Sequence, residues 1–247
     1  MNIDVAFLPS QARTWRDSIC IVVDVLRASS TIVVAFEQGA SLVIPVSSMT
    51  AGRKLARRNR YIFCGDTHIL GMNSFDMDNS PSEMSKRNLG GRTVVLYTLN
   101  GSRVITQNRN VRHLLIGSLL NARACCELAL QLQRDSSADV GIICAGNHGE
   151  FALEDFLAAG YLVRELQKGT PGGRPGALIS EAAAAAAKLT DGAADVGAVF
   201  AETWSGQWLA QHGLEADVAY CQHRDTTRIV PVVHLDADSP VITPHRM

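Results

Sequence analysis

The sequence has almost no excess of either charge, since 23 Lys and Arg residues stand against 24 Asp and Glu residues in a chain of 247. Proteins that bind nucleic acid through its phosphates need clustered positive charge, because much of their affinity comes from the release of counterions. The balanced composition therefore argues against nucleic acid as a partner. The densest basic segment, Arg53 to Arg60, has helical spacing, and we interpret it as the solvated face of a helix.

Long apolar runs and paired cysteines are also missing. No stretch approaches the roughly 18 consecutive apolar residues of a membrane-spanning helix. Met1 to Asp4 lack the charged and then apolar order of a signal peptide. The six cysteines include no C-x-x-C pair, which argues against a zinc site or a disulfide scaffold. We expect a cytoplasmic protein with no membrane partner, whose cysteines are reduced and mostly buried.

Aromatic residues are scarce, at 6% of the chain, whereas apolar residues make up 47%. This balance favours helices layered on a sheet over an aromatic-rich sandwich. Four apolar, largely β-branched segments each end in small polar residues and then give way to a helical pattern. These segments are Ile19 to Asp24, Thr93 to Tyr97, Leu114 to Ile116 and Val140 to Cys144.

Strands that are apolar throughout are buried on both faces, as in a parallel sheet between two layers of helices. We therefore predict a three-layer α/β/α fold with a largely parallel or mixed central sheet. In open α/β sheets the ligand crevice lies beyond the carboxyl ends of the strands, so the loops after these four segments should converge.

A run of glycine and proline from Gly169 to Gly176 interrupts this pattern. The segment after it opens with Ser180 as an N-cap, then Glu181 and six alanines, which predicts a helix by propensity. We predict that residues 1–247 form either a single α/β enzyme unit or two intimately packed subdomains with a break near residues 169–176.

Asp24 follows a buried strand, where a carboxylate can meet solvent, a metal or a substrate. Three residues later, Arg27 offers a planar fork of donors that matches phosphate or carboxylate, and Ser29 adds a hydroxyl at a helix start. The combination predicts an anion site. The alternative is an ion pair between Asp24 and Arg27 next to a Ser/Thr cap. Leu26 stands where an aspartyl-nucleophile phosphatase would carry a second Asp, which disfavours that mechanism.

The loop from Gly146 through Asn147 and His148 to Gly149 leaves the fourth strand, and Glu154 and Asp155 follow on a helix. Neighbouring helix positions diverge by about 100°, so we expect only one of these acids to point at a site while the other hydrogen-bonds or caps. The alternative is a surface pair favoured by the helix dipole.

Two further polar blocks have structural explanations of their own. Asn79, Ser80 and Pro81 form a helix-entry signal, with Ser80 as the cap and Pro81 in the first turn. Asn100 and Gly101 form the commonest turn dipeptide. Either block can serve as a structural turn or as part of an anion site.

Five blocks follow one another along the chain: Val22 to Ser29, Asn79 to Pro81, Asn100 with Gly101, Gly117 to Ala122, and Cys144 to Gly146 with Glu154 to Phe156. Together they resemble the 2-phosphosulfolactate phosphatase family. The similarity implies an α/β/α hydrolase that depends on Mg²⁺, forms homodimers and acts on a small phosphorylated organic acid. Mg²⁺ prefers carboxylate oxygens, which Asp24, Glu154 and Asp155 can supply.

Our leading hypothesis, metal-assisted hydrolysis of a phosphate ester, assigns roles to these side chains. Asp24 would bind the metal or polarise the attacking water, and His148 or Asp66 would protonate the leaving oxygen. The negatively charged ends of the substrate would be held by a set of residues from several loops: Arg27, Ser29, Asn79, Ser80, Asn100, Gly101, Gly146 and Asn147.

The chain departs from the family at a few positions. It reads Gly65-Asp66-Thr67 where the family usually reads Gly-Glu-Arg, which removes a cation, and Leu99 and Asp78 also differ. We therefore expect a related acid substrate or a loss of phosphatase activity. Two other classes remain open: a lyase or transferase of small anionic acids on the same fold, and a non-catalytic anion-binding protein.

Overall fold

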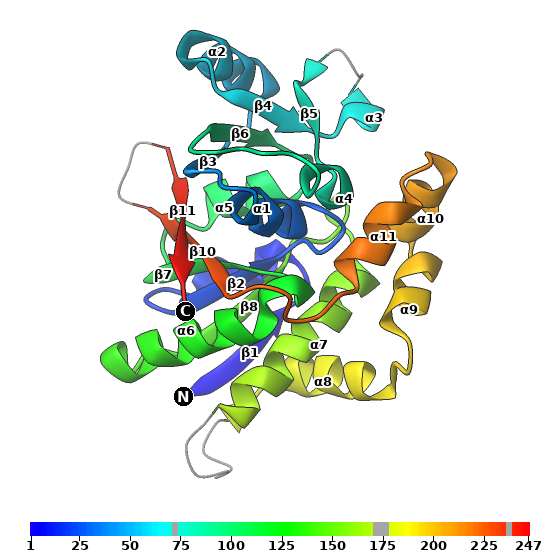
Figure 1. Ribbon diagram of the computed structural model, residues 1–247. Coiled ribbons are helices and arrows are strands. Elements are labelled where there is room, and N and C mark those ends of the chain that lie inside the picture. Colours follow the sequence, from blue (N-terminus) through cyan, green and yellow to red (C-terminus); the bar gives the residue numbers. More distant parts are fainter. Residues whose placement is uncertain (71–73, 170–177, 236–238) are drawn as a thin grey trace.

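The computed structural model describes residues 1–70, 74–169, 178–235 and 239–247 (Figure 1). Its strands form one sheet in the order β5-β4-β6-β3-β11-β10-β7-β2-β8-β1-β9. The strands are β1 (Asn2–Ala6), β2 (Ile19–Val23), β3 (Leu42–Pro45), β4 (Ile62–Gly65), β5 (Met77–Asp78), β6 (Thr93–Tyr97), β7 (His113–Gly117), β8 (Val140–Cys144), β9 (Leu178–Ile179), β10 (Ile229–His234) and β11 (Val241–Arg246).

The helices cover both faces of this sheet. They are α1 (Ala28–Glu37), α2 (Met49–Asn59), α3 (Thr67–Leu70), α4 (Pro81–Met84), α5 (Gly101–Gln107), α6 (Ala122–Ser136), α7 (Leu153–Lys168), α8 (Glu181–Gly192), α9 (Val196–Glu202), α10 (Trp204–Gln211) and α11 (Glu215–Cys221), with short 3-10 turns at Pro9–Thr14 and Leu119–Asn121. None of the described helices is long and apolar enough to cross a membrane.

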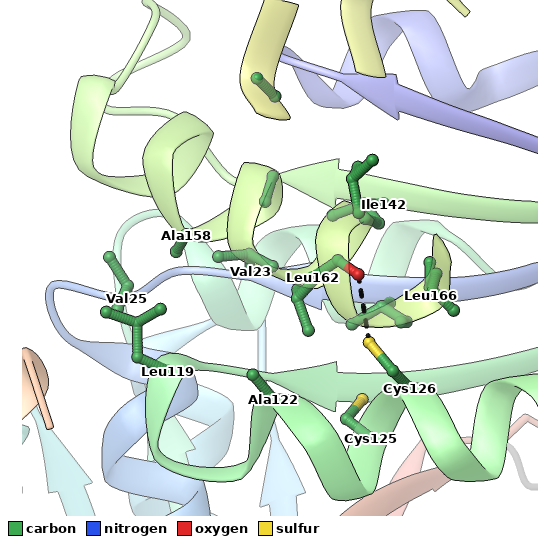
Figure 2. Close-up of a cluster of buried hydrophobic side chains, with 14 of the residues drawn as sticks. Val23, Val25, Leu119, Ala122, Cys125, Cys126, Ile142, Ala158, Leu162 and Leu166 are labelled. Atoms are coloured by element: carbon green, nitrogen blue, oxygen red, sulfur yellow. Dashed lines mark hydrogen bonds between the residues drawn. The ribbon is translucent and has the colours of Figure 1, made fainter. Parts of the chain in front are cut away.

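Strand β2 shows why the sheet lies between two helix layers. All five of its residues are buried, and successive side chains point to opposite faces. Ile21 and Val23 join a cluster with α6, α7 and α8 (Figure 2), whereas Cys20 and Val22 join a second cluster with α1 and α5. The predicted three-layer α/β/α fold is confirmed.

The sheet is mixed because an antiparallel pair stands at its centre. One parallel group contains β7, β2, β8, β1 and β9, and the other contains β3, β6, β4 and β5. Strands β10 and β11 lie between the two groups (Figure 1). This pair contacts its neighbours over a short length, since β10 meets β7 at Val232 and Val233 and β11 meets β3 at Ile242.

The local predictions hold in the described part of the chain. The four apolar segments form β2, β6, β7 and β8. Ser180 caps α8 by accepting a hydrogen bond from the N–H of Ala183, and the basic segment forms α2. The predicted break near residues 169–176 lies outside the described residues, apart from Gly169 at the end of α7.

Candidate active site

A cavity opens at the carboxyl ends of strands from both parallel groups. Loops after β2, β4, β6 and β8 reach it, together with the first turn of α7 and one side of α10. Three of the four loops predicted to converge therefore do so. The cavity is lined by Asp24, Leu26, Arg27, Asp66, Asn79, Thr98, Leu99, Asn100, Gly146, Asn147, His148, Glu154, Asp155, Trp204, Ser205, Trp208 and Leu209.

The prediction that the loop after β7 also reaches the cavity is wrong. Ser118 is fully buried, and its backbone N–H donates to Oδ1 of Asn121 at 3.0 Å. The Asn121 amide in turn donates to the carbonyl oxygens of Ile116 and Ile229. This loop is absent from the cavity lining because its polar groups tie β7 to β10.

The backbone after β2 holds the carboxylate of Asp24 in place. Its Oδ1 accepts a hydrogen bond from the N–H of Ala28 at 3.2 Å, and the Ser29 hydroxyl bridges the N–H and carbonyl of Asp24. A Cβ on Gly101 would lie 2.6 Å from Oδ2, so only glycine allows this approach. Ser29 and Gly101, predicted to bind substrate, therefore position Asp24 and do not line the cavity.

Two buried acids from α7 face Asp24. Asp155 accepts hydrogen bonds from the N–H groups of Val25 at 2.8 Å and Gly146 at 3.1 Å, one on each oxygen. Glu154 also lines the cavity and is 4% exposed. Both acids line the cavity, where we expected one to point at the site and the other to hydrogen-bond or cap. Asp155 nevertheless uses its oxygens to fix two loops, as expected for the second acid.

This crowding of negative charge shifts the ionisation of the acids. Burial, with the nearby charges of Asp66 and Glu154, raises the pKa of Asp24 to about 7, although the N–H groups of Ala28 and Gly101 act in the opposite direction. Burial and the charges of Asp24 and Glu154 also raise the pKa of Asp155 well above its ordinary value. Perturbed carboxyls in a cleft are typical of functional sites.

Arg27 pairs with three acids, and Asp24 is not among them. Its Nη1 lies 2.8 Å from both Asp78 and Asp217, and Nη2 lies 3.7 Å from Asp66. The alternative of an Asp24–Arg27 ion pair is therefore wrong in this structure. Arg27 is 5% exposed, and its guanidinium reaches the cavity already surrounded by carboxylates.

Thr67 and Asp78, two positions singled out in the sequence, contact each other. Thr67 donates from its N–H and its hydroxyl to Oδ1 of Asp78, at 2.9 and 2.5 Å, while Oδ2 of Asp78 takes Arg27. Asp66 accepts from the Asn79 amide at 2.9 Å and from the N–H of Leu99 at 3.2 Å. Burial raises the pKa of Asp66, although Arg27 and these donors act against the shift.

Polar groups at the rim link the loops after β6 and β8. The N–H of His148 donates to Oδ1 of Asn100 at 3.1 Å, and the Asn100 amide lies 3.4 Å from Oδ1 of Asn147. His148 is exposed at a left-handed φ of 51°, and its ring meets Trp204 edge to face. The predicted residues Asn100, Gly146, Asn147 and His148 thus meet at one wall of the cavity.

Ser80 was predicted to bind substrate, but it lies behind the cavity wall. It caps α4 by accepting from the N–H of Glu83, and its hydroxyl donates to Asp217 at 2.7 Å. Its neighbour Asn79 does line the cavity. The helix-entry role of Ser80 and Pro81 is confirmed.

Two parts of the site were not predicted from the sequence, namely Asp217 and the wall formed by α10. Asp217 is completely buried and accepts hydrogen bonds from Ser80, Ser82 and Arg27. Trp204 and Trp208 line the cavity, and they are two of only three tryptophans in the chain. The scarcity of tryptophan was a signal that these two residues could matter. Their place in the site could not be predicted, because they lie far along the chain from the loops after β2, β4, β6 and β8.

The acids fit a magnesium ion in their chemistry. Within the described ranges, no three His, Cys, Asp or Glu side chains are spaced to hold a metal ion. Mg²⁺ usually keeps several waters and binds through one or two carboxylates plus the phosphates of a substrate. Asp24 and Glu154 offer such oxygens, whereas both oxygens of Asp155 already accept hydrogen bonds.

Comparisons with known proteins identify one family of phosphatases. A family model described as 2-phosphosulpholactate phosphatase matches residues 7–236. A probable 2-phosphosulfolactate phosphatase of Clostridium novyi is 32% identical, over 95% of this chain and 97% of its own length. Proteins with the same description from Thermotoga petrophila and Carboxydothermus hydrogenoformans are 34% and 30% identical, over 94% and 100% of this chain and 95% and 99% of their own lengths.

Proposed function

The chain belongs to the 2-phosphosulfolactate phosphatase family, and we propose that it hydrolyses the phosphate ester of a small organic acid. The observation that carries this proposal is the buried carboxylate of Asp24, held beside Glu154 and Asp155 at the end of β2. Hydrolysis of phosphate monoesters is among the slowest uncatalysed reactions, so the site must both position water and offset phosphoryl charge.

We further propose that Mg²⁺ is the required cation, with Asp24 and Glu154 as its protein ligands. Four carboxylates line the cavity, from Asp24, Asp66, Glu154 and Asp155, and these would repel a phosphate group on their own. A bound Mg²⁺ would offset the charge on the phosphoryl oxygens. Asp155 then acts as a positioning residue, because it joins the loops at Val25 and Gly146.

The remaining groups divide the work of binding and proton transfer. The amides of Asn100 and Asn147 hold the acid end of the substrate, next to the backbone of Gly146. We assign proton donation to the leaving oxygen first to Asp66, which lines the cavity and whose pKa is raised by burial. His148, on the exposed rim, is the second candidate for that role.

The substrate we favour is a phospho-hydroxy acid related to 2-phosphosulfolactate. Thr67 supplies no cation, and Asp78 engages Arg27, so the described wall near Asp66 offers little to a second strong anion such as a sulfonate. Apolar side chains of Leu99, Trp204 and Leu209 face the cavity instead.

The direct test is a phosphate-release screen over 2-phosphosulfolactate and phosphorylated hydroxy acids, with MgCl₂ or with EDTA. We expect release that requires Mg²⁺ and that falls by about 100-fold or more in Asp24→Asn. An accepted substrate whose turnover changes with neither treatment would contradict the mechanism. A tightly held acid without phosphate release would instead favour a lyase or transferase.

We propose that the protein is a cytoplasmic homodimer that binds neither nucleic acid nor membranes, which follows the family resemblance and the balanced charge of the chain. Light scattering on the eluting protein measures the molecular mass directly, and a value near the 26.6 kDa of one chain would contradict dimerisation.

A further inference from the structure

The helix α2 carries like charges on one face, and nothing in the active site uses them. Arg53 and Arg57 are four residues apart, which places them on one side of the helix, and Arg60 follows as its C-cap at a left-handed φ of 58°. Like charges at that spacing disfavour a helix. Stability of the isolated helix therefore gives no reason for this arrangement.

The three side chains line a groove between α2 and the start of β4, and Arg92 joins them from the turn before β6. No ion pair with a carboxylate involves any of the four arginines in the ranges that the structure describes. Asp76 is the acidic residue of the lining, and one of its oxygens accepts a hydrogen bond from the N–H of Phe63.

The fold builds this groove by close packing beneath it. A Cβ on Gly52 would lie 2.7 Å from Val46 and 2.9 Å from the ring of Phe63, so the missing side chain lets α2 approach the sheet. Arg53 is held there with its Nε buried and without a hydrogen-bond partner in the described structure. A buried donor without a partner is costly, and a ligand oxygen would satisfy it.

We propose that this groove is a second binding site, for a small anion that carries two or more phosphate groups. Guanidinium groups bind phosphate oxygens through paired hydrogen bonds, and four of them arranged along a groove match several phosphates better than one. The half-buried rings of Tyr61 and Phe75 in the lining give the same ligand an apolar surface.

The groove is separate from the active site, although one strand connects them. Tyr61 and Phe63 border the groove at the start of β4, whereas Asp66 reaches the active-site cavity just after its end. Substitutions in the groove therefore leave the basal phosphatase machinery intact.

The test is calorimetric titration of the full chain with inorganic pyrophosphate at low ionic strength. We expect binding that weakens at least about 10-fold in Arg53→Gln/Arg57→Gln and in Arg92→Gln, which comes from a different segment. Arg58→Gln is the matched control, because Arg58 lies on the same helix but outside the groove lining. Circular dichroism checks that each variant is folded.

Three results would overturn the proposal. The first is equal pyrophosphate binding by the wild-type protein and the folded groove variants. The second is an equal loss in Arg58→Gln, which would mean that general surface charge is responsible. The third is binding of orthophosphate as tight as that of pyrophosphate, since one phosphate group cannot span the set of arginines.

Discussion

Three carboxyl groups of the cavity are buried close to one another, which is unfavourable for the stability of the fold. Asp24, Asp66 and Asp155 are each buried and each resist ionisation, because charged oxygens lose their hydration and repel one another. The backbone N–H groups that donate to these carboxyls offset only part of the lost hydration energy. A site of this kind stores unfavourable electrostatic energy in the free protein, and binding of a cation would release it.

Replacing Asp24 with Asn should raise the stability of the protein at high pH while it lowers the phosphatase activity. Its pKa rises from 3.8 to about 7 on folding, so between these pH values the folded state binds more protons than the unfolded state, and the free energy of unfolding falls as pH rises. We expect Asp24→Asn to be more stable than the wild type at pH 8, by on the order of 1–2 kcal/mol, and little changed at pH 4.

Urea unfolding at the two pH values measures this difference, while phosphate release measures the loss of activity. Asp135→Asn, an exposed acid on α6, is the control and should leave both unchanged. A variant that is less stable than the wild type at pH 8 would contradict the electrostatic argument.

Asp217 should be among the most sensitive acids of the chain. Asp217→Ala removes the carboxylate that accepts from the buried hydroxyls of Ser80 and Ser82, whereas Arg27 keeps Asp78 and Asp66 as partners. A buried donor left without an acceptor typically costs about 1–3 kcal/mol, and we expect Asp217→Ala to lower the free energy of unfolding by about that amount. Chemical denaturation provides the measurement. Glu127→Gln, at the exposed pair with Arg228, should change stability little.

At the scale of elements, the helices and strands that could be predicted are those determined by residues close together in the sequence. Apolar runs fixed β2 and β8, and the cap residues Ser80 and Ser180 marked the starts of α4 and α8. The candidate site was predicted in part, because residues that follow strands share a common edge. The partners of Arg27 could not be predicted, since Asp217 comes from a helix 190 residues later in the chain.

The central hairpin escaped prediction for a related reason. Proline is normally confined to edge strands or bulges, because it cannot donate to the ladder. Pro231 and Pro244 nevertheless face each other in β10 and β11 in the middle of the sheet. Both lie outside the short stretches where this pair bonds to β7 and β3, so the missing donors are not needed there.

The contact between α7 and α8 depends on a glycine. A Cβ on Gly160 would lie 2.1 Å from the carbonyl oxygen of Ala186 and 2.2 Å from the hydroxyl of Thr190. We expect Gly160→Ala to destabilise the fold by about 1–3 kcal/mol through overpacking, despite the better helix propensity of alanine. Gly192→Ala, with nothing near the added carbon, is the control in thermal melts. Equal melting temperatures for both variants would contradict the close packing.

At the scale of the whole molecule, the two helix layers shield all six cysteines. Burial raises the pKa of Cys20 to about 12, and it also raises the pKa of the thiols of Cys126 and Cys144. Because the thiolate is the reactive form, we expect Ellman's reagent to label none of them in the native protein within minutes. All six should react in guanidinium chloride. Rapid labelling of a native thiol would show that a layer opens.

The position of β11 in the sheet sets the order in which the protein can be assembled during synthesis. Among the strands that the structure describes, β11 is made last, yet its Ile242 pairs with Val43 and its partner β10 meets β7. The two parallel groups are thus translated long before the hairpin that joins them. Until the β10–β11 hairpin has left the ribosome, β3 and β7 are unpaired edge strands, one in each parallel group. Unpaired edge strands are prone to aggregate or to bind chaperones.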